Sequence, residues 1–380
     1  MSLFTTPVSD DSNTPRRRFT GAGAYHQTTY KKETMKRKIT NPHFPAYGPS
    51  QWLFQGPPAE SKFLAVTNSC LAQISTIMKA KSLFTLAATA ALITSAAASI
   101  TIDYVSVGNP GNAADPATGS LYGAVAYAYQ IGKYEVTNAQ YGAFLNAVDP
   151  GGANANGVYN TLMGSNARGG ITYTAGAASG EKYTIRTSMG DKPVNYVSWY
   201  DAARFANWLG NGQGSGSTET GAYTLSLNTG IITKNSGANV YLPSENEWYK
   251  AAYYSAANTS YSLYPNGQNT ITTADANYGN SVGSTTDVGS YSGDGSSYGT
   301  FDQGGNVWEW NDAVISGSSR GLRGGSFNNS ESFLRSSFRN SNDPTLGNGY
   351  IGFRVASVPE PTSMVLTMLA SGVMLIRRKR

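Results

Sequence analysis

The stretch DQGGNVWEW, residues 302–310, carries the strongest indication of how this chain folds. Two carboxylates, Asp302 and Glu309, lie seven residues apart with a glycine pair between them. Calcium takes about six to eight oxygen ligands from carboxylates and backbone carbonyls, so a glycine-containing loop of this length can wrap around such an ion. The alternative is that Glu309 pairs with a core arginine such as Arg323 or Arg354.

A second stretch, RGGSFNNSESFLRSSFR at 323–339, contains a glycine pair, a serine, amides and three arginines. Arginines here could line a cleft for an acidic or glycan ligand, but a structural role, bonding to buried carbonyls and carboxylates, is favoured. The arginines concerned are Arg323, Arg335, Arg339 and Arg354. Trp308 and Trp310 are likewise expected to anchor the core rather than to form a platform for sugars.

The composition favours a loop-rich, strand-containing exported protein. Of 380 residues, 40% are apolar and only 13% are charged, while 43 are glycine and 25 are tyrosine. The net charge is +5, yet residues 99–357 contain 13 Lys and Arg against 18 Asp and Glu. The excess of basic residues therefore lies in the two ends. The acidic body carries no basic stripe, so no nucleic-acid partner is expected.

Cysteine and histidine are almost missing. Cys70 is the only cysteine, and His26 and His43 are the only histidines, so all three precede Met78. If the mature protein begins after that point, it cannot use a Cys or Ser nucleophile paired with His, a histidine-ligated zinc or iron, or a disulfide.

The first 98 residues are predicted to contain a signal for export. Residues 1–77 show no sustained hydrophobic period and are expected to be a disordered or mis-annotated upstream extension. From Met78 the sequence MKAKSLFTLAATAALITSAAA places two lysines before an apolar run and small residues, which predicts a secretory signal peptide over 78–98. A short buried helix is the alternative. Because a signal peptide does not act from the interior of a chain, Met78 is the expected start.

The last 23 residues, 358–380, are typical of a sorting signal. Pro359-Glu360-Pro361 precedes a short apolar run, and the chain ends in RRKR. This order resembles the PEP-CTERM signal of Gram-negative bacteria. The resemblance implies export, recognition by an exosortase as partner, and transient anchoring in the inner membrane before display at the cell surface. An ordinary C-terminal membrane anchor is the alternative.

The body of the chain shows three helix starts and several short strands. Thr137, Ser198 and Ser244 each precede an acidic or amide residue three positions later and then an apolar face, which is the signature of a helix N-terminus. Short strands are expected near Tyr127–Ile131 and Gly352–Ala356. Few helices, many loops and short strands predict an α+β fold.

These elements in this order resemble the formylglycine-generating enzyme family, also called sulfatase-modifying factors. The further matching motifs are GNVWEW (305–310), RGGSF (323–327), LRSSFRN (334–340) and IGFRV (351–355). The match spans roughly residues 125–356, and the family domain is assigned to 99–357. The resemblance implies a loop-rich variant of the C-type lectin-like fold. It also implies oxidation of a substrate cysteine to formylglycine by copper held on two cysteines.

The chain departs from that family at the reactive position. The family's cysteine pair lies shortly after RGGS, where this chain has Asn328 and Asn329. Copper(I) requires soft thiolate ligands, so copper is not expected. A related branch of iron-dependent sulfoxide synthases needs histidine ligands, which are also missing. Ser326 matches the serine of the motif but has no activating base, and these three residues form a vestigial site.

The resemblance implies a calcium site in the 302–310 stretch. Its ligands would be the side chains of Asp302 and Glu309 and the carbonyls of Gly305 and Val307. A second, weaker family site would fall near Asn277 and Tyr278.

The leading hypothesis is therefore an exported, calcium-stabilised module without catalytic activity, which binds an extracellular polysaccharide or protein or serves a structural role. One alternative is an enzyme with a divergent modifying activity on exported proteins or polysaccharide. Another is an extracellular matrix scaffold without a ligand. Tyrosines are concentrated in the loops at 253–264 and 291–298, and tyrosine suits ligand surfaces because it offers contact area at low entropic cost.

Overall fold

A computed structural model describes residues 99–225, 231–293 and 295–358, which all belong to one compact unit. The predicted extension, the predicted signal peptide and residues 359–380 of the predicted sorting signal lie outside the described residues. Within the described ranges, no helix is both long and apolar enough to cross a bilayer.

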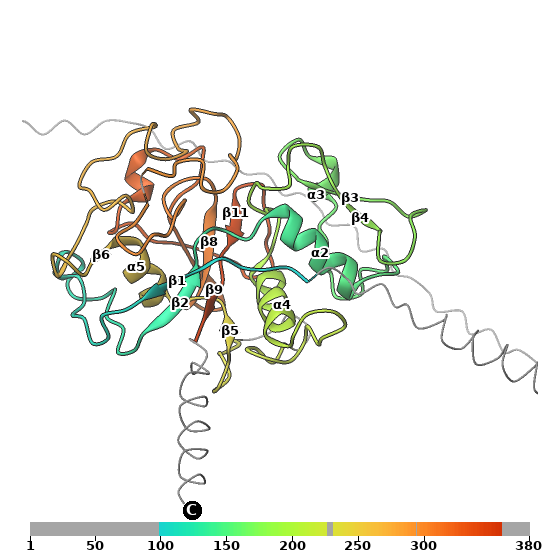
Figure 1. The fold of residues 1–380 in the computed structure, drawn as a ribbon, viewed down its shortest axis with the longest axis horizontal. Helices are drawn as coiled ribbons and strands as arrows, with labels where there is room; N and C mark the ends of the chain where they lie inside the picture. The colour runs from blue at the N-terminus through green and yellow to red at the C-terminus, as the bar shows by residue number, and fades with distance from the viewer. Residues whose placement is uncertain (1–98, 226–230, 294, 359–380) are drawn as a thin grey trace, which may run out of the picture. The chain divides into compact units, whose positions relative to one another are not determined.

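Two four-stranded sheets organise the fold (Figure 1). The first sheet is antiparallel, in the order β1 (Tyr104–Val107), β2 (Tyr129–Gly132), β12 (Ala356–Ser357) and β5 (Val240–Tyr241). The second has the order β10 (Asn340–Asn342), β9 (Ser319–Arg323), β8 (Trp308–Ser316) and β11 (Ile351–Phe353), and only β8 and β11 run parallel. Two hairpins complete the strands: β3 (Ile171–Tyr173) with β4 (Tyr183–Ile185), and β6 (Tyr254–Ser255) with β7 (Ser260–Tyr261).

The three predicted helix starts are confirmed. Thr137, Ser198 and Ser244 each accept a hydrogen bond from the backbone three residues on, and the side chain there bonds back, so all three are capping boxes. They open α2 (Asn138–Val148), α4 (Trp199–Gly210) and α5 (Glu245–Tyr253). The remaining helical turns are η1 (Pro116–Thr118), α3 (Leu162–Ser165) and η2 (Glu331–Leu334). The α+β class is thereby confirmed, while the C-type lectin-like detail stays a prediction.

The predicted strand over Gly352–Ala356 is two strands in two different sheets. β11 pairs with β8, and only two residues later β12 enters the first sheet between β2 and β5. The sequence pattern of Gly352–Ala356 does not reveal this change because both strands are buried on both faces. Arg354 and Val355 form the crossover, and the Val355 carbonyl accepts a hydrogen bond from Gly132 N at 2.8 Å.

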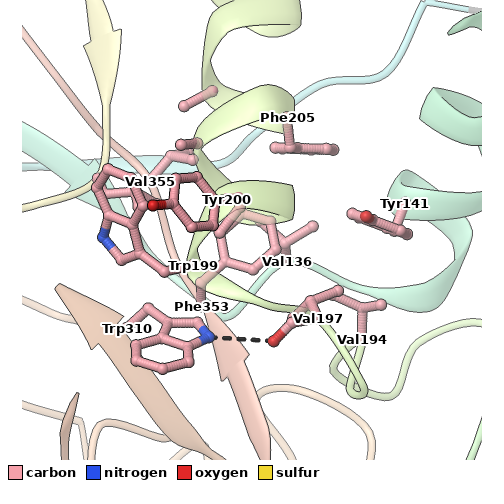
Figure 2. Close-up of a cluster of buried hydrophobic side chains, with 14 of the residues drawn as sticks. Val136, Tyr141, Val194, Val197, Trp199, Tyr200, Phe205, Trp310, Phe353 and Val355 are labelled. Carbon is pink, nitrogen blue, oxygen red and sulfur yellow. Dashed lines mark hydrogen bonds between the residues drawn. The ribbon is translucent and has the colours of Figure 1, made fainter. Parts of the chain in front are cut away.

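An aromatic core holds the helices on the second sheet. Phe205 of α4 packs against Phe353 of β11 with ring centroids 5.4 Å apart, and Tyr141 of α2 packs against Phe205 at 5.9 Å. Figure 2 shows these rings together with Trp310, whose indole nitrogen donates to the Val197 carbonyl at 3.1 Å. Figure 1 shows α2 and α4 on one side of β8, β9 and β11, and α5 on the other. The expectation that Trp308 and Trp310 anchor the core is met, since they are 4% and 0% exposed.

The loop that leads into β8 is pressed against a neighbouring loop. Gly305 has φ of 90°, and a Cβ built on it would lie 2.2 Å from the Asn277 carbonyl oxygen. The next residue, Asn306, donates its backbone N–H to that same carbonyl at 2.9 Å. Glycine is therefore required here both by conformation and by space.

We expect Gly305→Ala to destabilise the protein by about 2–5 kcal/mol, since a left-handed residue costs about 1–2 kcal/mol and overpacking a further ~1–3 kcal/mol. Gly317→Ala is the matched control, because Gly317 also has a positive φ but has open space around it. Urea denaturation of both variants measures the difference. Equal losses of stability would contradict the proposed backbone contact.

Candidate functional site

Glu309, near the end of the 302–310 stretch, forms a buried ion pair with Arg354. The Arg354 guanidinium donates from Nε to Glu309 Oε2 at 2.6 Å and from Nη2 to Oε1 at 2.7 Å. The Trp248 indole nitrogen donates to Glu309 Oε2 at 2.7 Å. Both charged side chains are completely buried. Bidentate geometry and the extra indole bond offset the large cost of removing the two charges from water.

Glu309 therefore pairs with a core arginine, as in the alternative interpretation of the sequence, and this arginine is Arg354. Arg354 also donates to the carbonyls of Gly132, Lys133 and Phe301, at 2.8–3.2 Å. Both carboxylate oxygens of Glu309 face this guanidinium, and its part in a calcium site stays a prediction. The structural role favoured for Arg354 is supported by these contacts.

The structure brings a third carboxylate, Glu135, to the same place. Glu135 is 2% exposed, and it accepts from Asn306 Nδ2 at 2.8 Å and from the Val307 backbone at 3.2 Å. Burial, followed by the negative charges of Asp302 and Glu309, raises the pKa of Glu135 well above its ordinary value. Sequence analysis missed this residue. Its only signal in the sequence was one acidic residue in IGKYEV, residues 131–136, which leads to α2.

Asp302 lies in the same electrostatic environment. Burial is the main cause that raises its pKa to about 6, and repulsion from Glu309 adds to it. A hydrogen bond of 2.6 Å from the Gly289 backbone and the charge of Arg354 act in the opposite direction. Three carboxylates thus share one guanidinium, which leaves the region with excess buried negative charge if all of them are ionised.

The weaker predicted site, Asn277 and Tyr278, lies next to this cluster. Asn277 is 1% exposed, its Nδ2 donates to the Ser284 carbonyl at 2.9 Å, and its Oδ1 has no hydrogen-bond partner among the described residues. The Tyr278 hydroxyl instead donates to the Ile271 carbonyl at 3.1 Å, away from the carboxylates. A buried unpaired amide oxygen costs about 1–3 kcal/mol unless a water or a cation satisfies it.

The three residues of the vestigial site are hydrogen-bonded to one another, with Ser326 buried and Asn328 exposed. Ser326 is completely buried, and its hydroxyl oxygen lies 2.8 Å from Asn328 Oδ1 and 2.7 Å from Asn329 Oδ1. The Asn329 amide oxygen also accepts from the Ser326 backbone at 3.0 Å. Both hydrogen bonds of the hydroxyl go to amide oxygens, and an amide is not a general base that could activate it.

The remaining arginines of the 323–339 segment have mainly structural contacts. Arg323 is completely buried and pairs with Glu245 of α5, with nitrogen and oxygen 2.6 Å apart. Arg339 is partly exposed and donates to the same carboxylate at 2.7 Å. Arg335 is exposed and donates to the Tyr264 hydroxyl at 3.0 Å. The structural interpretation thus holds for Arg323, while Arg335 remains open to solvent.

The donor set of the described residues suits hard cations only. No cysteine or histidine lies after Cys70, so thiolate and imidazole ligands for copper or iron are missing from the sequence itself. Residues 99–225, 231–293 and 295–358 contain no group of three or more acidic, His or Cys side chains with metal-binding geometry. A calcium ion would therefore need backbone carbonyls and amide oxygens in addition to carboxylates.

The chain matches the family described as "Sulfatase-modifying factor enzyme 1-like domain" over residues 111–358. Its curated relatives include hercynine oxygenases. The protein from Mycolicibacterium thermoresistibile is 27% identical over 262 residues, which cover 60% of this chain and 50% of that protein. The protein from Mycobacterium tuberculosis is 27% identical over 256 residues, with 60% and 52% covered. This chain thus spans about half the length of the curated relatives it matches.

Solved structures similar to this one include variable protein 1 of Treponema denticola and CarF. The first has a TM-score of 0.47 at 22% identity, covering 69% of this chain and 97% of that chain. CarF has a TM-score of 0.47 at 23% identity, covering 69% and 100%.

We expect Arg354→Met to lower the free energy of unfolding by about 3–5 kcal/mol, because it leaves the Glu309 charge buried without its partner. Arg335→Met, which removes an exposed arginine of the same region, should have no measurable effect. Urea denaturation of the two variants tests this expectation. Equal midpoints and slopes for the two variants would show that the buried pair is not needed for stability.

Proposed function

The chain belongs to the sulfatase-modifying factor family, and we propose that it is a member without the family's redox chemistry, acting as a calcium-stabilised binding module. The observation that carries this proposal is that the sequence after Cys70 contains no cysteine or histidine to bind copper or iron. Copper oxidation requires two thiolates, and the positions after RGGS hold Asn328 and Asn329, whose amides are already bonded to Ser326.

Loss of chemistry at this site also agrees with its packing. Leu334, eleven residues after Arg323, is completely buried and fills the space against Gly304 and Gly325. The Tyr253 hydroxyl donates to the Leu334 carbonyl at 3.0 Å, and this bond holds the 323–339 segment against α5. Ser326 itself is completely buried, which favours a structural role for its side chain.

The alternative is an enzyme, and the curated relatives favour it because they are hercynine oxygenases. This chain spans about half of their length, so their activity does not carry over without a test. A divergent modifying activity would have to use residues other than Cys and His. A bare matrix scaffold is the remaining alternative.

The cation that we propose for this site is calcium. Glu135 is buried, Asp302 is half-buried, and the single positive charge of Arg354 offsets only one of the three carboxylates. A divalent ion bound by Asp302, Glu309 and the carbonyls of Gly305 and Val307 would neutralise the excess charge. It would supply structural stabilisation and no chemical step.

The proposed location is the surface of a Gram-negative cell or its exterior. The support is the predicted signal peptide at 78–98 and the predicted sorting signal at 358–380, which imply export and handling by an exosortase. A transient membrane anchor at the C-terminal end is part of the same proposal.

For the activity, we expect no formylglycine when the purified protein is incubated with copper, oxygen and a cysteine-containing peptide, and no oxygenation of hercynine when iron is supplied. Mass spectrometry of the peptide and of hercynine is the measurement. Turnover in either assay, abolished by Ser326→Ala but not by Ser332→Ala, would overturn the proposal in favour of the enzyme.

For the cation, we expect excess calcium to raise the melting temperature by about 5–10 °C, since ligand at 100 times Kd adds about 2.7 kcal/mol and a domain of this size gains about 2–4 °C per kcal/mol. Asp302→Asn should abolish the shift, while Asp191→Asn, which removes an exposed carboxylate, should preserve it. Differential scanning calorimetry with calcium or with a chelator provides the measurement. An unchanged melting temperature of the wild type would rule out the site.

A further inference from the structure

One pocket of the structure is lined by residues that lie far along the chain from the 323–339 segment. It is formed where the loop that contains η1 meets the hairpin of β6 and β7, and its volume is about 630 Å³. This volume lies within the range of about 300–1,000 Å³ typical of small-ligand sites. Figure 1 shows β6 next to α5, at the end of the molecule where the η1 loop also lies. None of the residues of the vestigial or predicted calcium sites line this pocket.

The pocket has an aromatic wall. Tyr254 and Tyr261 face each other across the hairpin with ring centroids 5.0 Å apart. Tyr249 of α5 supports Tyr261 from behind, with centroids 5.6 Å apart. Alanines and Pro116 of the η1 loop complete the apolar part of the lining. Rings of this kind present flat apolar faces with a polar edge, which suits ligands that are apolar on one side and polar on the other.

The wall is held rigidly before any ligand binds. The Tyr261 hydroxyl donates to the Ala113 carbonyl at 2.8 Å and accepts from Asn112 Nδ2 at 2.7 Å. The backbone of Gly123 approaches so closely that a Cβ there would lie 2.5 Å from the Tyr261 hydroxyl oxygen. The hairpin is therefore fixed to the η1 loop, and binding needs little further ordering of these rings.

Hydroxyl groups surround the aromatic wall. Ser120, Thr259 and Ser260 line the pocket, are exposed, and use their side chains in no hydrogen bond within the described residues. Ser120 and Thr259 have φ of 61° and 48°. Positive φ is unusual for a β-branched residue such as Thr259, and such strain is concentrated at ligand-binding loops. The free hydroxyls can donate to and accept from a polar ligand.

The pocket presents no free charge. Asp115 is its only lining carboxylate, and it is 4% exposed. Its Oδ1 accepts from the Ala117 backbone at 2.9 Å, and its Oδ2 accepts from the Tyr249 hydroxyl at 2.5 Å. No lysine or arginine lines the pocket. An ionic ligand would lose its hydration without gaining an opposite charge, so the pocket favours a neutral ligand.

From these observations we infer that the pocket between the η1 loop and the β6–β7 hairpin binds a neutral saccharide. A sugar ring offers an apolar C–H face to Tyr261, the more exposed of the two rings, and its hydroxyl groups match those of Ser120, Thr259 and Ser260. The inference builds on the proposed binding role and gives it a site and a ligand class. It does not depend on calcium, because the pocket shares no residue with the predicted calcium site.

The test is binding of the purified protein to a panel of neutral di- to tetrasaccharides built from glucose, mannose, galactose or N-acetylglucosamine. Sulfated and uronic-acid oligosaccharides and a proline-rich peptide serve as the competing ligand classes. We expect at least one neutral oligosaccharide to bind in isothermal titration calorimetry, and the charged ones to bind at least tenfold more weakly. Failure of every neutral saccharide, or binding of the peptide alone, would overturn the inference.

Three variants locate the binding. Ala117→Trp places a large side chain at an exposed position of the lining and should weaken binding of the best saccharide at least tenfold. Ala126→Trp, at an exposed alanine outside the lining, should leave it unchanged. Ser260→Ala should weaken binding about 2–10-fold, the share of one hydrogen bond. Equal affinities of the two Trp variants, with unchanged melting temperatures, would show that the sugar binds elsewhere.

A negative result here is distinguishable from failure of the proposed function. The calcium-dependent shift in melting temperature and the absence of peptide oxidation are measured on the same protein without saccharide. If they hold while no saccharide binds, the calcium-stabilised module stands and only this pocket assignment is lost.

Discussion

The hydrogen-bonded pair of Glu309 and Arg354 connects the parts of this fold. Glu309 belongs to β8 in the second sheet, while Arg354 lies in the crossover from β11 to the first sheet. The guanidinium also reaches the carbonyls of Gly132 at the end of β2 and of Phe301 in the loop before β8. A single planar cation thus joins two sheets and a loop. In a fold with short strands, such side-chain bonds to carbonyls replace pairing that regular strands would supply.

Local chemistry made much of the fold predictable. Each capping box depends on residues within one helical turn, so Thr137, Ser198 and Ser244 identified α2, α4 and α5 from sequence alone. The family could be predicted from ordered motifs, because these are short and contiguous. The division of Gly352–Ala356 into two strands could not be predicted, since it depends on which distant strands each half pairs with.

The candidate site was harder to predict from the sequence for the same reason. Whether Glu309 faces a metal or an arginine depends on a partner 45 residues away, and the sequence is compatible with both alternatives. Glu135 joins Val307 across 172 residues, so nothing near Glu135 in the sequence pointed to the 302–310 stretch. The pocket between the η1 loop and the β6–β7 hairpin likewise combines segments that are far apart, since Tyr261 and Ala113 are separated by 148 residues. Sequence composition indicated tyrosine-rich loops without indicating which loop they would meet.

The position of β12 has a consequence for how the molecule acquires its structure. This two-residue strand lies between β2 and β5, and Arg354, just before it, contacts Gly132 across 222 residues. The first sheet therefore cannot close until almost the entire domain has been synthesised. Contacts of such long range slow folding, because the entropy of closing the intervening chain is lost before they form. A nascent chain would therefore remain incompletely folded during most of its synthesis, which is the state that the proposed export would require.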